Sequence, residues 1–213
     1  MKEKGLRLYT LDTEELSDET YFRKCYESLS VFRQQKIDSY RFLADKKLSL
    51  GVGILLDRGL AEYGLREAKV RIAQKENGKP YLPDYPEIHY NLSHSGNMAL
   101  AVFAGTEIGC DIEQIQSANL KLAKRFFSSE EYLYIAELEG ERQNYAFCRL
   151  WTLKESFLKV TGMGMKLPLD SFEFRLSAAE QSITVQQNYD NRQYEFTEYD
   201  LGGYHAAVCV QME

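Results

Sequence analysis

Apolar and polar positions recur along the chain with two spacings, and each spacing predicts a different kind of element. Helical spacing predicts helices over 18–35, 43–63 and 144–161. The last of these stops before Gly162, a residue type that often ends helices. A further helix is expected to open at Ser128, because an S-x-x-E capping box begins there. The chain therefore carries several amphipathic helices.

Segments rich in Val, Ile, Tyr and Phe predict strands between and after these helices. They are 68–74, 87–92, 98–104, 107–112, 171–176, 183–187, 194–199 and 205–211. Gly51 and Gly53 fall inside the second predicted helix, where glycine costs roughly 1 kcal/mol relative to alanine. We therefore expect another element to pack closely against that helix.

A long helix followed by several strands occurs twice. The segment GNMALAVF, which begins at Gly96, resembles GYHAAVCV, which begins at Gly203. This pattern predicts an α+β protein with an N-terminal half at 1–105 and a C-terminal half at 106–213. A duplicated unit with pseudo-twofold symmetry is one interpretation, and two unrelated halves that each end in an apolar strand are the other. If the unit is duplicated, the seam between the halves is the natural place for a ligand.

Composition narrows the class of protein. Of 213 residues, 26 are Lys or Arg and 32 are Asp or Glu, so the formal charge is -6. This is the profile of a globular protein, and it makes nucleic acid a poor partner. The four cysteines lie far apart without a CxxC pair, which disfavours a zinc site. No apolar run approaches the roughly 20 residues of a membrane span and no secretory signal is recognisable, so we expect a cytoplasmic protein.

Asp111 and Glu113 form the first candidate site. In a strand, alternate side chains share a face, which places both carboxylates on one side and Cys110 and Ile112 on the other. Paired carboxylates repel each other unless a cation lies between them, and Mg²⁺ prefers such oxygen ligands. The D-x-E pattern alone also fits a solvated acidic strand end, so both interpretations stay open.

A helical stripe forms the second candidate site. Trp151, Glu155 and Lys159 follow one another at i, i+4 spacing. An exposed Glu155–Lys159 ion pair is the common use of this spacing. The alternative is that Glu155 supplies a third carboxylate and Lys159 a cation for a phosphate, with the chain's single tryptophan at the base of the site.

Two turns and a basic stretch offer groups that bind phosphate. Residues 90–96 (YNLSHSG) run from a strand into a polar turn, and neither serine lies in the G-x-S-x-G elbow of a hydrolase. Residues 77–80 (NGKP) present one lysine in a turn without Walker spacing. Local turn hydrogen bonds or a solvated face would also explain each of these segments. The basic residues of the stretch are Arg33, Lys36, Arg41, Lys46 and Lys47.

In this order, the segments resemble the 4'-phosphopantetheinyl transferases, specifically the long, monomeric type that activates peptide synthetases. GKPYLP, NLSHSG, IGCDIE, AKRFFSSEEY and LWTLKESFLKVTGMG carry the resemblance over about residues 78–176. The pair G-x-D-x-E and W-x-x-K-E-x-x-x-K is its most specific part. The resemblance implies the fold of that family: two similar α/β halves related by pseudo-twofold symmetry, with the active site at their interface. The short, trimeric carrier-protein synthases are a poorer match.

The resemblance also implies roles for matching residues. Asp111, Glu113 and Glu155 match the acidic residues that hold Mg²⁺ on the coenzyme A pyrophosphate. Glu155 and Lys159 match catalytic residues, Glu155 as base, metal ligand or both. Asp111 and Lys159 also match residues that bind coenzyme A. The other implied coenzyme A contacts are Lys154, the adenine-side turn Lys79 and Pro80, the 3'-phosphate pair Ser93 and His94, and, where the alignment is loose, Lys47, Arg33 and Lys36.

The implied reaction is Mg²⁺-dependent transfer of 4'-phosphopantetheine from coenzyme A to a serine of an apo acyl or peptidyl carrier protein. Adenosine 3',5'-bisphosphate is released, in the service of fatty acid, polyketide or nonribosomal peptide biosynthesis. We expect a monomer that works without nucleic acid or membrane. Carrier proteins are typically small and acidic, so docking on this acidic chain needs a local basic or apolar patch.

Phe126, Phe127 and Tyr132, near the start of the capped helix, are candidates for an apolar docking edge, and filling the core under that helix is the other interpretation. Two alternative functions remain at this point. One is a metal-dependent phosphohydrolase or nuclease, which also uses carboxylates and a lysine. The other is an inactive module that binds coenzyme A.

Overall fold

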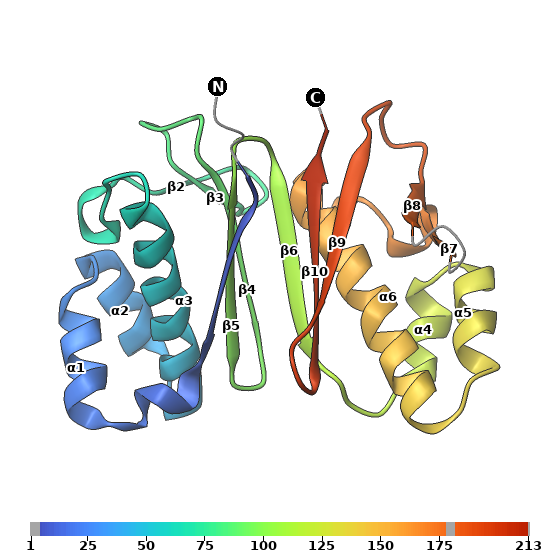
Figure 1. The fold of residues 1–213 in the computed structure, drawn as a ribbon, viewed down its shortest axis with the longest axis horizontal. Coiled ribbons are helices and arrows are strands. Elements are labelled where there is room, and N and C mark those ends of the chain that lie inside the picture. The colour runs from blue at the N-terminus through green and yellow to red at the C-terminus, as the bar shows by residue number, and fades with distance from the viewer. Residues whose placement is uncertain (1–4, 178–181, 213) are drawn as a thin grey trace. The chain divides into compact units, whose positions relative to one another are not determined.

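The computed structural model describes residues 5–177 and 182–212. The chain divides into two compact units, Met1–Gly105 and Thr106–Glu213. Each unit combines helices with a three-stranded antiparallel sheet (Figure 1). The prediction of an α+β fold with two similar halves is therefore confirmed.

In the first unit, helices α1, α2 and α3 cover one face of a sheet with the order β1-β5-β4 (Figure 1). A small β2-β3 hairpin adjoins β4. The elements are β1 (Arg7–Asp12), η1 (Thr13–Ser17), α1 (Glu19–Glu27), α2 (Val31–Ser39), α3 (Leu43–Ala61), η2 (Glu67–Lys69), β2 (Ala73–Gln74), β3 (Pro80–Tyr81), β4 (His89–Ser95) and β5 (Met98–Ala104).

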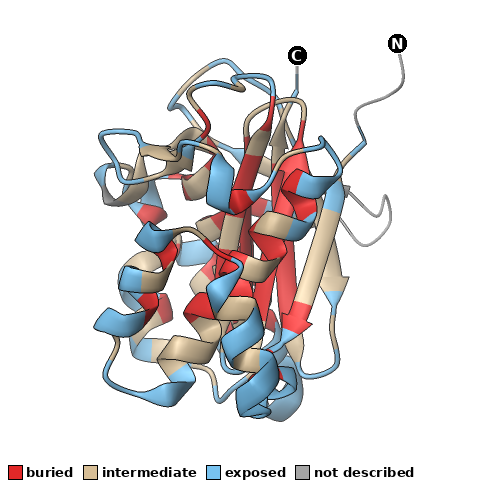
Figure 2. Ribbon diagram, turned by 90° about the vertical axis from the view of Figure 1, so that its left-hand side faces the viewer, coloured by how far each residue is buried: buried red, intermediate tan, exposed pale blue. Residues whose placement is uncertain are grey.

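The core of the first unit lies between α3 and the sheet. Leu55 and Leu60 of α3 are fully buried, as is Phe103 of β5. Figure 2 shows buried residues along the strands and on the helix surfaces turned toward them. A Cβ at Gly51 would lie 3.1 Å from Thr13 Cγ2, and one at Gly53 would lie 2.6 Å from Leu29 Cδ1. The close packing expected around these two glycines is confirmed.

In the second unit, the long helix α6 packs on a sheet with the order β6-β10-β9. Helices α4 and α5 lie on the same side of that sheet as α6 (Figure 1). The elements are β6 (Ile108–Gln114), α4 (Leu120–Phe126), α5 (Ser129–Ala136), α6 (Gly140–Thr161), η3 (Gly164–Lys166), η4 (Leu169–Ser171), β7 (Glu173–Ser177), β8 (Ser182–Gln186), β9 (Tyr194–Asp200) and β10 (Tyr204–Gln211).

The predicted helix boundaries are confirmed at two places in the second unit. The Ser128 side chain accepts a hydrogen bond from Glu131 N, and the Glu131 side chain accepts one from Ser128 N, which completes the capping box. Gly162 ends α6 with a left-handed φ of 70°. Helix α6 begins at Gly140, four residues before the predicted start, and α4 was not predicted.

Three predictions in the first unit were wrong or incomplete. The single helix over 18–35 is two helices, because Ser30 caps α2 and its backbone N–H donates to Glu67 Oε2 at 2.7 Å. Only residues 73–74 of the predicted strand 68–74 are extended in a sheet. Strand β1 was missed, and its partner β5 is about 90 residues away in sequence. Among the described helices, none is long and apolar enough to cross a membrane.

Candidate active site

Strand β6 presents the two predicted carboxylates on one face. Asp111 is 4% exposed, and Glu113, two residues on, is partly exposed. The intervening Ile112 is fully buried. The pleat of a strand produces this alternation. The two carboxylates share their face with Gly109, where α6 crosses the strand.

Gly109 lets α6 come unusually close to β6. A Cβ at this position would overlap the carbonyl oxygen of Ser156 and the amide nitrogen of Val160, which are backbone atoms of α6. Only glycine leaves room for so close an approach. The approach brings the Glu155–Lys159 turn of α6 against the face of β6 that carries Asp111.

Lys159 and Asp111 form an ion pair in this structure. Lys159 Nζ lies 2.7 Å from Asp111 Oδ1, and the Asp111 side chain is 6% exposed. Burial lowers the pKa of Lys159, but Asp111, Cys110 and Glu155 together outweigh burial, and the pKa is raised overall. The ammonium form of Lys159 is therefore favoured on the acidic face of β6.

The side chain of Glu155 lies in the same acidic environment as that of Lys159. Its pKa is raised, first by burial and then by the negative charge of Asp111, while Lys159 opposes the shift and Glu113 adds to it. The three predicted carboxylates thus act on one another electrostatically, although they come from two elements.

The donor set suits a hard divalent cation. Within residues 5–177 and 182–212, no three His, Cys, Asp or Glu side chains stand close enough to hold a metal ion as they are. Even so, Asp111 and Glu113 both raise the pKa of Glu155, and a divalent cation would relieve that repulsion. All three groups offer carboxylate oxygens, the donors that Mg²⁺ takes. The residues fit the ion.

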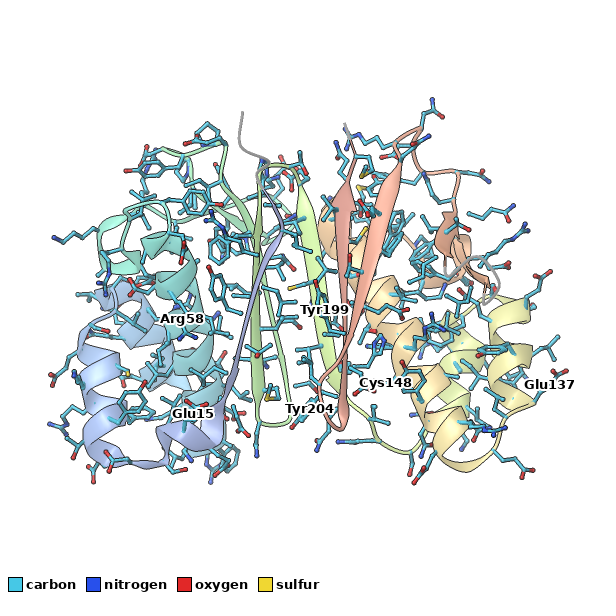
Figure 3. The ribbon with its side chains drawn as sticks, viewed as in Figure 1. Glu15, Arg58, Glu137, Cys148, Tyr199 and Tyr204 are labelled. Atoms are coloured by element: carbon cyan, nitrogen blue, oxygen red, sulfur yellow. The ribbon has the colours of Figure 1, made fainter. Side chains whose placement is uncertain are left out.

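A cavity of about 380 Å³ in the second unit opens beside Glu113. Trp151, Phe147 and Cys148 line it from α6. Cys148 Sγ lies 3.6 Å from the carbonyl oxygen of Glu113, and Figure 3 shows its side chain between α6 and the sheet. The chain's only tryptophan therefore borders a space next to a predicted metal ligand.

Lys154 has different surroundings from its neighbour Glu155. It is fully buried, and its Nζ lies 2.8 Å from Glu131 Oε2. It also donates to the carbonyl oxygens of Leu169 and Phe172 at 2.8 Å each. These partners occupy all three ammonium protons and the side chain points into the core, which makes Lys154 less suited to the implied coenzyme A contact.

The three candidates for the apolar docking edge differ in how far they are buried. Phe127 is 4% exposed and stacks against Phe147 and Trp151, so it fills the core rather than offering a surface. Phe126 and Tyr132 are partly exposed. Of the predicted edge, these two alone retain accessible surface.

The predicted coenzyme A residues of the first unit lie at two places. Ser93 is buried and His94 exposed near the end of β4, where the β4–β5 turn follows. Lys79 and Pro80 are partly exposed and follow a turn with Gly78 at φ 83°. Figure 1 shows the β2–β3 hairpin at the end of the unit away from the β4–β5 turn, so the structure does not bring these pairs side by side.

The upstream basic residues also differ from one another. Lys47 Nζ donates to Ser17 Oγ at 2.8 Å. Lys36 is exposed on α2. Arg33 is 7% exposed and lies 3.8 Å from the fully buried Glu67. Arg33 thus has a buried counter-ion, which leaves Lys36 and Lys47 as the more accessible cations.

One polar network was missed by the sequence analysis. Arg149 donates to both carboxylate oxygens of Glu198, at 2.7 and 2.6 Å. Glu198 Oε1 lies 3.1 Å from His205 Nε2, and Thr152 Oγ1 lies 2.7 Å from His205 Nδ1. About 50 residues separate Arg149 and Thr152 of α6 from their partners Glu198 and His205, and no local sequence pattern could have joined them.

Comparison with known proteins follows the division of the chain. Residues 17–107 match the family "4'-phosphopantetheinyl transferase, N-terminal", and residues 107–209 match the "4'-phosphopantetheinyl transferase superfamily". The two matches meet at residue 107, next to the boundary between the two compact units. The chain belongs to the 4'-phosphopantetheinyl transferase superfamily, and it is a transferase.

Its relatives resemble it over most of its length. The 4'-phosphopantetheinyl transferase ffp of Bacillus subtilis is 36% identical over 85% of this chain and 82% of its own. Psf-1 of Bacillus pumilus is 34% identical over 97% of this chain and 90% of its own. Sfp of Bacillus subtilis is 40% identical over 70% of this chain and 66% of its own. The chain is therefore of the Sfp-like type.

Proposed function

We propose that this enzyme transfers the 4'-phosphopantetheine group of coenzyme A to a serine of an apo carrier protein and releases adenosine 3',5'-bisphosphate. The observation that carries the proposal is the convergence of Glu155 and Lys159 of α6 with Asp111 of β6, across the close approach at Gly109. Family membership leaves the phosphohydrolase and the inactive binding module without support.

Mg²⁺ is the ion that we propose for the three carboxylates. Asp111, Glu113 and Glu155 would hold it, and it would supply positive charge to the pyrophosphate oxygens of coenzyme A. The candidates for coenzyme A contacts in the first unit are the cations Lys47 and Lys79, the neighbouring Pro80 of the hairpin, and Ser93 and His94 near the separate β4–β5 turn. Lys36 stays a weaker candidate, and Arg33 and Lys154 are less suited because both are buried against carboxylates.

Glu155 is the proposed proton acceptor. The serine oxygen of the carrier forms a bond to the β-phosphorus of coenzyme A, and its proton passes to Glu155, directly or through a water. Burial, the largest cause of the raised pKa of Glu155, favours proton uptake by this carboxylate, as general base catalysis requires. The bond from that phosphorus to the oxygen of adenosine 3',5'-bisphosphate breaks in the same step.

Lys159 is the proposed partner of the leaving group. Its ammonium group stabilises the negative charge that collects on the departing phosphate oxygen. Asp111 holds Lys159 in place and charged before substrate arrives. Phe126 and Tyr132 remain candidates for the surface that the carrier touches, as the partly exposed members of the docking edge.

Intact-mass spectrometry tests the proposal. An apo carrier protein incubated with the enzyme, coenzyme A and Mg²⁺ should gain the mass of one phosphopantetheine, and EDTA should abolish the gain. Glu155→Gln should slow transfer at least about 100-fold, and Asp111→Ala should abolish Mg²⁺-dependent transfer. Glu137→Gln, an exposed residue at the end of α5 (Figure 3), is the matched control and should leave the rate unchanged.

Circular dichroism would establish that each variant is folded. A Glu155→Gln enzyme with near-normal turnover would refute the role of Glu155. Carriers from several pathways that gain no mass with the unaltered enzyme would refute the reaction as a whole.

A further inference from the structure

Lys154 and Glu131 form a buried ion pair that ties four segments of the second unit together. The Lys154 side chain is fully buried and that of Glu131 is 3% exposed, and the two charged atoms are 2.8 Å apart. The same ammonium group donates to the carbonyl oxygens of Leu169 and Phe172. One lysine of α6 is thereby bonded to α5, to η4 and to the start of the β7 segment.

Glu131 extends the connections on its side. Its Oε2 accepts from Ser128 N at 2.9 Å, which closes the capping box of α5. Its Oε1 accepts from Phe174 N at 2.9 Å, which fixes the first residues of β7. Both carboxylate oxygens are used, and each serves a different element.

Aromatic rings enclose the pair. Lys154 Nζ lies 4.5 Å from the centre of the Phe172 ring, 5.5 Å from that of Phe127 and 6.0 Å from that of Phe174. Such contacts favour a cation, but they do not make a buried ion pair a net source of stability over apolar residues of similar size. The pair therefore calls for an explanation other than stability.

The ion pair is explained by its effect on Glu155, the residue that follows Lys154. Successive residues of a helix point about 100° apart, so fixing Lys154 toward α5 and β7 fixes the direction of Glu155 as well. Four residues after Glu155, Lys159 reaches Asp111 on β6. Helix α6 is thus held on one side by the Lys154–Glu131 pair and on the other by β6.

We infer that Lys154 and Glu131 are positioning residues, which set the rotation of α6 about its axis so that Glu155 and Lys159 face the acidic side of β6. This inference rests on the proposed roles of Glu155 and Lys159. It differs from a contact between Lys154 and coenzyme A, because a positioning residue acts on the chemical step and a contact acts on affinity.

The test replaces the pair by neutral side chains of similar shape. In Glu131→Gln/Lys154→Met, no charge is left buried alone, so the protein should fold. Its single-turnover rate constant should fall about tenfold or more, because small misplacements of catalytic groups are costly, while the dissociation constant for coenzyme A with Mg²⁺ changes less than about twofold.

Two further variants support the interpretation. Glu131→Asp keeps both charges but shortens the link by one methylene, so it should show a smaller loss of rate with the same affinity, and it serves if the double variant does not fold. Arg71→Met/Asp84→Asn removes an exposed ion pair of the first unit and is the matched control, with no expected change.

The outcomes separate cleanly. Weaker binding of coenzyme A at an unchanged rate would assign Lys154 to the ligand and overturn the inference. Unchanged rate and affinity in folded variants would make the pair purely structural and also overturn it. Glu155→Gln is measured in parallel: if it retains activity, the proposed function fails first, whereas an inactive Glu155→Gln with a fully active double variant refutes the positioning role alone.

Discussion

Glu198 is held ionised by two basic side chains. Burial raises the pKa of its carboxyl, but the His205 ring and the Arg149 guanidinium outweigh burial and bring the pKa to about 2. The side chain is 19% exposed, so solvent screens these interactions only in part. The carboxylate consequently stabilises the fold at neutral pH, and this stabilisation is lost in acid.

The sign of the pH effect follows from proton uptake. In the unfolded chain the carboxyl of Glu198 regains its ordinary pKa of 4.5. Below about pH 5 this carboxyl therefore binds a proton in the unfolded chain, whereas in the folded chain it stays ionised until the pH approaches 2. The stabilisation is complete above that pH and is lost as the pH falls toward 2. Between pH 7 and pH 3 the loss amounts to roughly 2 kcal/mol of the free energy of unfolding.

We therefore expect Glu198→Gln to flatten the acid side of the stability curve. Urea unfolding at pH 7 and pH 3 should show that the unaltered protein loses about 2 kcal/mol more than the variant over this interval. The comparison uses the difference between the two pH values, because the substitution also changes stability at neutral pH by leaving Arg149 without its carboxylate. Equal losses in both proteins would contradict the assignment.

The close packing of helix α6 on strand β6 depends on one small residue, Gly109. A side chain at Gly109 would meet backbone atoms of α6, which cannot rotate away as a side chain would. Gly109→Ala should therefore push the two elements apart, at a cost of about 2–3 kcal/mol in the free energy of unfolding. It should also slow transfer, because Glu155 and Lys159 would move away from Asp111.

Urea unfolding and the transfer rate would both be measured for this variant. Gly5→Ala is the matched control, since nothing lies within 4 Å of a Cβ there, and its stability should stay within about 0.5 kcal/mol of the starting value. A Gly109→Ala protein as stable and active as the control would show that the close approach is not required.

Elements were predictable from the sequence where local signals decide them. The capping box at Ser128 and the glycine stop at Gly162 are local, and both are where the pattern indicates. The break between α1 and α2 is different, because the Ser30 cap is completed by Glu67, which is 37 residues away. Strand β1 likewise owes its state to pairing with β5.

The distinction between local signals and distant contacts also decides which features of the candidate site could be predicted from the sequence. That Asp111 and Glu113 share a face could be predicted from strand alternation, and that Glu155 and Lys159 share a stripe from helical spacing, because each pair lies within one element. The environment of Lys154 could not, since its partners come from α5 and from the segment after α6. Sequence spacing gives the direction of a side chain within its element but not what fills the space there.

At the scale of the whole molecule, net charge affects how strongly the proposed carrier protein binds. The chain carries a formal charge of -6, and we expect the proposed carrier partner to be acidic as well. Two bodies of like charge repel each other over roughly 10 Å at 0.1 M salt and further in dilute buffer. Docking must therefore rely on local contacts that act at short range.

We expect salt to help this association. Raising NaCl from about 20 mM to about 200 mM should lower the KM for an acidic carrier about two- to threefold, because screening removes repulsion. Steady-state kinetics at saturating coenzyme A and Mg²⁺ would measure it. A KM that rises steeply with salt would show instead that a local basic patch governs docking.

The wall of the cavity beside Glu113 gives the enzyme a built-in optical probe. Trp151 is the only tryptophan among 213 residues, and it borders that cavity together with Phe147 and Cys148. Light absorbed selectively by indole therefore excites one place in the second unit, and the first unit contributes no signal. A ligand that binds at this wall would change the polarity around the indole, so the emission of unlabelled enzyme should report binding beside the acidic face of β6.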